Sequence, residues 1–365
     1  MPAQVLGENE QLKVEDLVVR FYTYEGIVKA VEKAKLTLMK GETLGVVGET
    51  GSGKSVTALT IMALTPTPGK VEGGHIYFKG TTGETVDVLS LKEAGLLKIR
   101  GKEISMIFQE PNAALDPLFK VGDQIAEAIL AHRLPEMLEK ANQLKKEKAN
   151  NSSFLKSLPI LRNRSRDKLL QQVVRKEILE LLRLMEISDP ERVIDAYPHE
   201  LSGGMQQRIV IATALACSPT LLLADEPTTN LDVTVQAQIL DLITRLKRRF
   251  GSSIIYITHD MGVIAEICDR VAVMYAGSVV EVAPVLEIFK TPLHPYTKAL
   301  LESIPRPGSS FKSIPGTVPN LVTPPSGCRF HPRCYHAMEK CSREIPELKE
   351  ISKGHCVACF LYGDA

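Results

Sequence analysis

Eight residues near the amino-terminus, GETGSGKS from Gly48 to Ser55, have the residue types and spacing of a phosphate-binding loop. Its glycines allow successive backbone N–H groups to face phosphate oxygens, and the helix expected after the loop adds a favourable dipole. Lys54 is expected to reach the β- and γ-phosphates of a nucleotide, and the Ser55 hydroxyl to coordinate Mg²⁺. A glycine-rich turn without function is a poor alternative, because the full pattern follows an apolar strand and precedes an apolar helix.

A pair of carboxylates ends the apolar run LLLADE, Leu221 to Glu226. A buried strand rarely ends in two adjacent charges, because desolvating a carboxylate is costly. Asp225 fits a Mg²⁺-side role, and Glu226 fits a residue that polarises the attacking water. The pair is a weak signal alone and a strong one beside the phosphate-binding loop.

The elements around these residues predict an α/β fold. Alternating short runs over 12–42 indicate antiparallel strands, and residues from about 123 to 184 indicate helices. From Pro198 onward, helices alternate with apolar runs such as TLLLADEP and SIIYITHD, which predicts a parallel sheet covered by helices. After Pro305 a segment rich in Pro, Gly and Ser is typical of an extended linker.

Composition excludes several classes of protein. The 365 residues carry 44 basic and 43 acidic side chains, a balance that argues against a broad nucleic-acid surface, so no nucleic-acid partner is expected. No apolar run approaches the ~18 residues of a membrane span, and the first residues do not resemble a signal peptide. The basic stretch 136–176 is interpreted as a solvated helical excursion, with contact to anionic lipid or to a partner subunit as the alternative.

The sequence LSGGMQQR, Leu201 to Arg208, resembles the signature motif of ABC-type ATPases and precedes LLLADEPT as in that family. Ser202, Gly203 and Gly204 at a helix N-terminus would offer a second set of phosphate-seeking N–H groups. The resemblance implies a dimer in which the signature of each subunit closes over the ATP of the other.

Further residues match family landmarks in the same order. Gln109 resembles the Q-loop glutamine near Mg²⁺, Asp232 the D-loop aspartate, and His259 the switch histidine at the γ-phosphate. The resemblance places an aromatic residue against adenine, here Tyr24, with Phe21 and Tyr22 as alternatives. Two positions depart from the common pattern, Asn230 in the D-loop and Met205 in the signature. The nucleotide contacts implied in and just after the loop are those of Gly48, Glu49, Thr50, Gly51, Ser52, Gly53, Lys54, Ser55 and Thr57.

The end of the chain holds five of its seven cysteines. Together with PLHPYTKALLESIPRP, this tail resembles the ATP-binding subunits of oligopeptide and dipeptide importers, a branch that also includes nickel and oligosaccharide systems. The resemblance implies a [4Fe–4S] cluster on four cysteines, although Cys356 leaves the last ligand open. Structural zinc and free thiols are the less favoured alternatives, and zinc is disfavoured because zinc sites typically use closely spaced cysteine pairs. The expected ligands are Cys328, Cys334, Cys341 and Cys359.

These observations predict a P-loop ATPase with a RecA-like parallel sheet, an antiparallel β subdomain and a helical subdomain. The expected organisation is a nucleotide-binding domain over 1–284, with helices at about 110–215 and a basic insertion at about 136–176, and a cysteine-bearing extension over 285–365. The expected function is ATP hydrolysis that drives import of di- or oligopeptides, or next of oligosaccharides.

The expected partners are two membrane permease subunits, a second and similar ATPase, and an extracytoplasmic substrate-binding protein, which places the chain at the cytoplasmic face of the membrane. The rival interpretation is a soluble ABC ATPase that acts on ribosomes or nucleic acid. A non-hydrolysing structural subunit would need a damaged Glu226 or His259, and both residues are present.

Overall fold

The computed structural model describes residues 6–150, 161–229, 231–304 and 314–362. The centre of the basic stretch and Asn230 therefore lie outside the described residues. The chain divides into two compact units. The first comprises residues 1–100, 220–226 and 243–365, and the second comprises residues 101–219 and 227–242.

The first unit opens with a four-stranded antiparallel sheet in the order β2-β1-β4-β5. Alternate residues of β1, such as Leu12 and Val14, are buried, which is the pattern of a sheet with one covered face. The antiparallel strands expected over 12–42 are confirmed. The strands are β1 (Glu10–Thr23), β2 (Gly26–Met39), β4 (Gly69–Lys79) and β5 (Thr85–Asp87).

A larger sheet forms the centre of the first unit and runs there in the order β11-β12-β10-β9-β3-β8-β7. β3 is parallel to β8 and β9, and β7 is parallel to β8, which confirms the expected parallel sheet. Every residue of β3, β7 and β8 is buried, as in a sheet covered on both faces. The strands are β3 (Thr43–Val47), β7 (Leu221–Asp225), β8 (Ser253–Ile257), β9 (Arg270–Tyr275), β10 (Ser278–Pro284), β11 (Lys349–Ser352) and β12 (His355–Val357).

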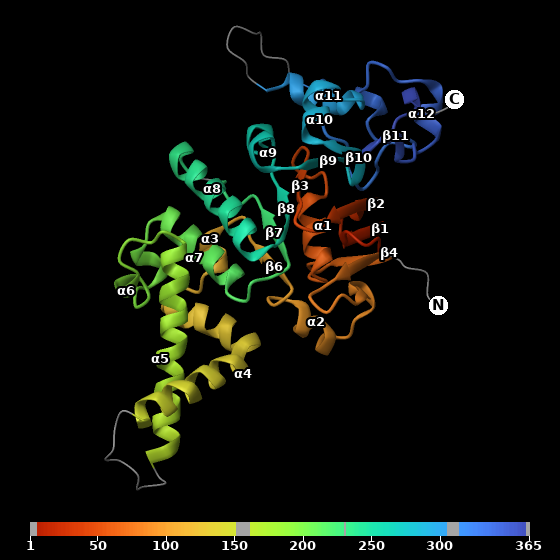
Figure 1. Ribbon diagram of the computed structural model, residues 1–365. Helices are drawn as coiled ribbons and strands as arrows, with labels where there is room; N and C mark the ends of the chain where they lie inside the picture. The colour runs from red at the N-terminus through yellow and green to blue at the C-terminus, as the bar shows by residue number, and fades with distance from the viewer. Residues whose placement is uncertain (1–5, 151–160, 230, 305–313, 363–365) are drawn as a thin grey trace. The chain divides into compact units, whose positions relative to one another are not determined.

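The helices of the first unit include α1, which follows β3, and α10 and α11, which lead into the tail (Figure 1). The tail does not stand apart, because β12 pairs with β10 and extends the central sheet. Phe330 of the tail is 2% exposed and packs edge-on against Tyr275, with ring centroids 5.1 Å apart. The helices are α1 (Lys54–Ile61), α2 (Glu93–Ile99), α9 (Met261–Ile267), α10 (Val285–Lys290), α11 (Pro295–Glu302) and α12 (Glu339–Arg343), with 3₁₀ turns at Val88–Ser90, His331–Arg333 and Phe360–Tyr362.

The second unit is mainly helical, and the helices expected over 123–184 are confirmed for the described residues. Arg133 joins the two long helices by ion pairs to Glu136 of α4 and Glu177 of α5, at 2.8 and 2.5 Å. The hydrogen bond from Arg133 lowers the pKa of Glu136 to about 2. The elements are β6 (Ile104–Ile107), α3 (Pro111–Ala114), α4 (Val121–Asn150), α5 (Leu161–Leu184), α6 (Pro190–Val193), a 3₁₀ turn at Pro198–Glu200 and α7 (Gly203–Leu215), while α8 (Val233–Phe250) begins in this unit and ends in the first.

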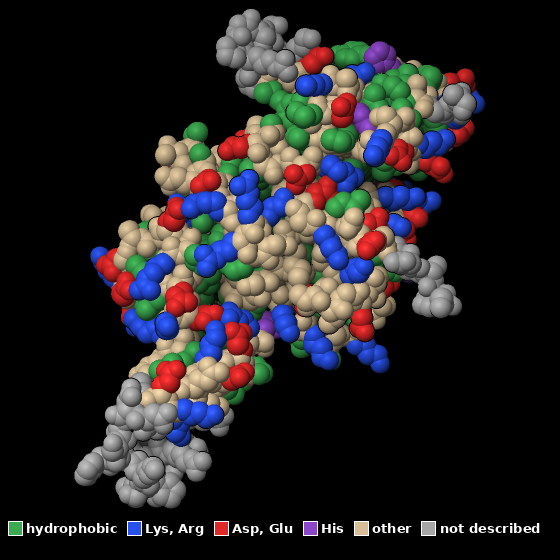
Figure 2. Space-filling view, viewed as in Figure 1, with side chains coloured by type: hydrophobic (Ala, Val, Ile, Leu, Met, Phe, Trp, Pro, Cys, Tyr) green, Lys and Arg blue, Asp and Glu red, His purple; other side chains and the backbone are tan. Residues whose placement is uncertain are grey.

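The surface agrees with the near-zero net charge. Basic and acidic side chains are interspersed on the face shown in Figure 2. Within the described ranges, none of the helices combines the length and the apolar character that crossing a bilayer requires.

Candidate active site and cysteine-lined cavity

The phosphate-binding loop lies between β3 and α1, as the sequence predicts. Glycine is required at Gly48, where a Cβ atom would lie 2.1 Å from the carbonyl oxygen of Met274. Gly53 has φ +98°, a left-handed conformation that other residues rarely adopt, and the helix begins at the next residue. The loop can therefore curl tightly against the sheet only with this glycine pattern.

Lys54 points back across the loop. Its Nζ donates to the carbonyl oxygens of Gly48 and Glu49 at 2.8 and 3.1 Å. Burial lowers the pKa of Lys54, while the neighbouring carboxylates oppose this effect. Thr57 uses its hydroxyl to brace the loop, because Oγ1 donates to the Gly53 carbonyl at 2.8 Å. Its expected nucleotide contact remains a prediction.

Ser55 and Asp225 meet at the proposed Mg²⁺ position. Ser55 Oγ donates to Asp225 Oδ1 at 3.0 Å. Asp225 is 5% exposed, and burial raises the pKa of its carboxyl group. Two adjacent oxygen donors of this type fit Mg²⁺, which prefers oxygen ligands. A cation here would offset the desolvation of Asp225.

Glu226 and His259 form the second polar pair. The two are 3.1 Å apart, from Glu226 Oε1 to His259 Nδ1. Glu226 has φ +45°, an uncommon backbone conformation that is typical of functional sites. Its side chain is 14% exposed and that of His259 is 62% exposed, so both can be reached from solvent.

The other landmarks of the cassette lie in the second unit. Gln109 follows β6 and is exposed. Ser202 caps α7 by accepting a hydrogen bond from Met205 N at 3.4 Å, so Gly203 and Gly204 form the first turn of that helix. Asp232 caps α8 by accepting from Val235 N at 2.9 Å. The roles of these residues in binding nucleotide remain predictions.

The other residues expected to contact nucleotide differ in their exposure to solvent. Tyr24 lies in the turn between β1 and β2, is fully exposed, and could receive an adenine ring on its face. Thr50 and Gly51 lie at the exposed crest of the loop, and Ser52 is buried.

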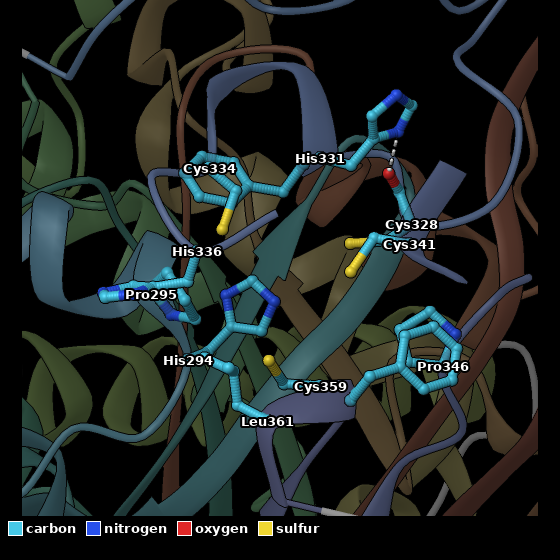
Figure 3. A pocket seen from close by; sticks show the side chains of 12 residues that line it. His294, Pro295, Cys328, His331, Cys334, His336, Cys341, Pro346, Cys359 and Leu361 are labelled. Carbon is cyan, nitrogen blue, oxygen red and sulfur yellow. Dashed lines mark hydrogen bonds between the residues drawn. The ribbon is translucent and has the colours of Figure 1, made fainter. Parts of the chain in front are cut away.

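The four expected cysteine ligands line a single cavity in the tail (Figure 3). Their sulfur atoms face a common space into which the ring of His294 also projects. Cys356 is not among the lining residues, because it lies on β12 and faces Glu350 and Val282 in the register of the sheet. The lining cysteines are Cys328, Cys334, Cys341 and Cys359.

Burial dominates the electrostatics of this cavity. It raises the pKa of the Cys328 thiol to about 11 and also raises the pKa values of Cys334 and Cys359. It lowers the pKa of His294 to about 3, so this ring is neutral. Among the described residues, no group of three or more His, Cys, Asp and Glu side chains is arranged to hold a single metal ion.

Sequence reasoning missed the residues that hold the phosphate-binding loop from outside. Arg333 and Tyr296 bind Glu49, which the sequence presents only as one of eight loop residues, and Tyr275 in turn accepts a hydrogen bond from Arg333. The available signal was the arginine beside Cys334 in CRFHPRC, a charged residue next to an expected ligand.

Comparisons with known proteins extend these observations. Residues 31–229 match the family described as ABC transporter, and residues 280–341 match the oligopeptide/dipeptide transporter, C-terminal region. The chain is 46% identical to a probable peptide ABC transporter ATP-binding protein of Sinorhizobium fredii, covering 96% of this chain and 94% of that protein. It is 44% identical to a dipeptide transport ATP-binding protein of Bacillus subtilis, with 96% and 94% covered.

Solved structures give the same fold. The chain resembles the dimeric structure of a bacterial ABC transporter cassette with TM-score 0.57 and 26% identity, over 75% of this chain and 98% of that one. It also resembles a dimeric cassette in a post-hydrolysis state bound to ADP and Pi, with TM-score 0.56, 25% identity and the same coverage. These findings confirm the expected ABC cassette fold and ATPase class. The chain belongs to the ABC transporter family, as an ATP-hydrolysing subunit that carries the oligopeptide/dipeptide transporter C-terminal region.

Proposed function

We propose that this chain hydrolyses ATP to drive the import of di- or oligopeptides through a membrane complex. The observation that carries this proposal is the similarity to peptide-transport ATP-binding proteins along nearly the whole chain, tail included. The comparisons lend no support to an oligosaccharide cargo, or to a soluble ATPase acting on ribosomes or nucleic acid.

Residues of the first unit would bind the nucleotide and the Mg²⁺ and catalyse hydrolysis. Lys54 and the loop N–H groups would bind the β- and γ-phosphates, and Ser55 and Asp225 would hold Mg²⁺, which neutralises phosphate charge. Glu226 accepts a proton from the attacking water while the water oxygen forms a bond to the γ-phosphorus. The bond from the γ-phosphorus to the bridging oxygen breaks at the same time, which releases ADP and phosphate. His259, 3.1 Å from Glu226, orients that carboxylate and is available to the γ-phosphate.

The second unit would complete the site of a partner ATPase. Ser202, Gly203 and Gly204 place backbone N–H groups at the start of a helix of 13 residues, where an anion is stabilised. We assign them, with Asp232, to the ATP of a second, identical or similar subunit. Closure on ATP and opening after hydrolysis would then move the attached membrane subunits.

Contact with two permease subunits fits the exposed apolar residues of the segment between β6 and α4, which also contains Gln109. Phe108, Leu118 and Phe119 are 41%, 80% and 56% exposed, unusual positions for large apolar side chains. They would pack against the permeases at the cytoplasmic face of the membrane, while an extracytoplasmic binding protein delivers the peptide.

The tail is proposed to hold a [4Fe–4S] cluster. Four thiols line one cavity, and thiolates are the ligands that iron–sulfur clusters require. We favour a cluster over zinc because the spacing of these cysteines differs from the closely spaced pairs of typical zinc sites. Bound there, the cluster would cross-link the tail and add folding free energy.

The test is purification of the tagged full-length chain from membranes under anaerobic conditions. We expect two multi-span proteins and a second ATPase to co-purify, and peptides, but not oligosaccharides, to stimulate ATP hydrolysis in the reconstituted complex with its binding protein. Co-purification of ribosomes or DNA without membrane proteins would refute the transport assignment. Iron and acid-labile sulfide in the same sample test the cluster independently.

A further inference from the structure

Arg333 of the tail binds the side chain of Glu49 in the phosphate-binding loop. Nη1 donates to Oε2 at 2.8 Å and Nη2 donates to Oε1 at 3.1 Å. The arginine is itself fixed, because Nε donates to the Pro315 carbonyl at 2.7 Å and Nη1 to the Tyr275 hydroxyl at 3.2 Å. The Arg333 side chain is 5% exposed and that of Glu49 is 24% exposed, so this bidentate pair is shielded from solvent.

A second contact holds the backbone of the same loop residue. The Glu49 N–H donates to the Tyr296 hydroxyl at 2.9 Å. The Tyr296 N–H donates in turn to His294 Nδ1 at 3.0 Å, and both residues are buried. Glu49 is therefore fixed at its carboxylate and at its backbone by residues outside the loop.

Both contacts lead to the wall of the cysteine-lined cavity. His294 lines that cavity, and so does Cys334, the residue after Arg333 (Figure 3). Close-packed, hydrogen-bonded groups transmit displacements because they leave little free volume. A change in the position of Cys334 would thus be transmitted to Arg333 and to the loop.

The charge of Glu49 gives the contact a consequence for ATP. A carboxylate in a loop that binds phosphate repels its ligand unless a cation neutralises it. Arg333 supplies that cation from behind the loop and turns the Glu49 carboxylate toward the tail.

We propose that Arg333 is a positioning residue of the phosphate-binding loop, and that occupancy of the cysteine-lined cavity sets the affinity for ATP through Cys334, Arg333 and Glu49. The first part of this proposal, the positioning role of Arg333, depends only on ATP binding by the loop. The second part, the effect of cavity occupancy, rests on the proposed four-cysteine centre.

The positioning part is tested with full-length Arg333→Met, Arg333→Lys and Glu49→Gln variants, by equilibrium binding of a non-hydrolysable ATP analogue. We expect Arg333→Met to raise the Kd about tenfold, which corresponds to about 1.4 kcal/mol, because the Glu49 carboxylate loses the cation that neutralises it. Lysine should restore part of the affinity. Adding Glu49→Gln to Arg333→Met should also restore affinity, because it removes the unneutralised charge, whereas a merely structural loss would not be restored.

The matched control is Arg343→Met, which removes another tail arginine, one that is 72% exposed and pairs only with Glu339 among the described residues. It should leave the Kd unchanged. If Arg333→Met and Arg333→Lys both bind the analogue as the wild type does, or if Glu49→Gln further weakens Arg333→Met, the positioning role is wrong. Thermal unfolding of each variant identifies any variant that fails to fold. If Arg333→Met does not fold, the affinity of Arg333→Lys for the analogue decides the positioning role.

The occupancy part is tested with Cys334→Ser, measuring iron, sulfide and analogue affinity on one preparation. We expect Cys334→Ser to lose its iron and its Kd for the analogue to rise as in Arg333→Met. The double variant Cys334→Ser/Arg333→Met should bind the analogue no more weakly than either single variant. Loss of iron with an unchanged Kd would refute the coupling. Absence of iron from the wild type would refute both the cluster and the coupling, while the Arg333 series would still decide the positioning role.

Discussion

Replacing Glu226 by glutamine isolates its proposed role as the base. Glutamine has the same shape and can keep the 3.1 Å contact to His259, but its amide cannot accept the proton of the attacking water. A positioned general base typically contributes about 10²–10⁴-fold to a rate. We therefore expect kcat to fall at least about 100-fold, equivalent to a barrier about 2.7 kcal/mol higher. Affinity for ATP should be unchanged or tighter, because a negative charge near the phosphates is removed.

The assay is phosphate release by the variant, together with size-exclusion chromatography in the presence of ATP. A trapped dimer should accumulate, because closure on ATP no longer ends in hydrolysis. Glu266→Gln on α9 is the matched control, since that glutamate is exposed and lies outside the proposed site. A Glu226→Gln variant that keeps more than about a tenth of wild-type kcat, or that stays monomeric with ATP bound, would contradict this assignment.

Three further predictions concern the interior of the first unit. Asp225→Asn should abolish Mg²⁺-dependent hydrolysis yet raise the Tm of the nucleotide-free protein at pH 7. Burial raises the folded-state pKa of Asp225, so the protonated carboxyl stabilises the fold below its ordinary pKa of 3.8, and this contribution is lost as pH rises through the folded-state pKa. The gain in Tm should therefore vanish in acid. Lys54→Met should weaken ATP binding more than about tenfold, as measured by equilibrium dialysis, with Tm unchanged or raised because a buried cation is removed. Phe330→Ala should lower the free energy of unfolding by about 3–5 kcal/mol in denaturant titration, and Leu361→Ala, at a residue that is 41% exposed, should lower it clearly less. A Phe330→Ala loss no larger than that of Leu361→Ala would contradict the assignment of the loss to burial.

Local sequence patterns determined much of this protein. The loop GETGSGKS needs glycine at Gly48, where the backbone lies against Met274, and at Gly53, which has a left-handed conformation. The sequence alone therefore predicted the position of the loop between β3 and α1. The mainly apolar runs of β3, β7 and β8 likewise indicated a sheet covered on both faces. In these cases the requirement is local, because the residue type itself restricts the backbone or the burial.

Contacts between distant segments were decided only by the tertiary structure. The sequence left Cys356 and Cys359 as alternatives, and the register of β12 against β10 placed Cys356 in the sheet and left Cys359 at the cavity. Arg333 and Glu49 are 284 residues apart, and nothing in their local patterns pairs them. Sequence periodicity reports which face of an element is buried, but the partner of a buried charge depends on how the folded chain brings remote elements together.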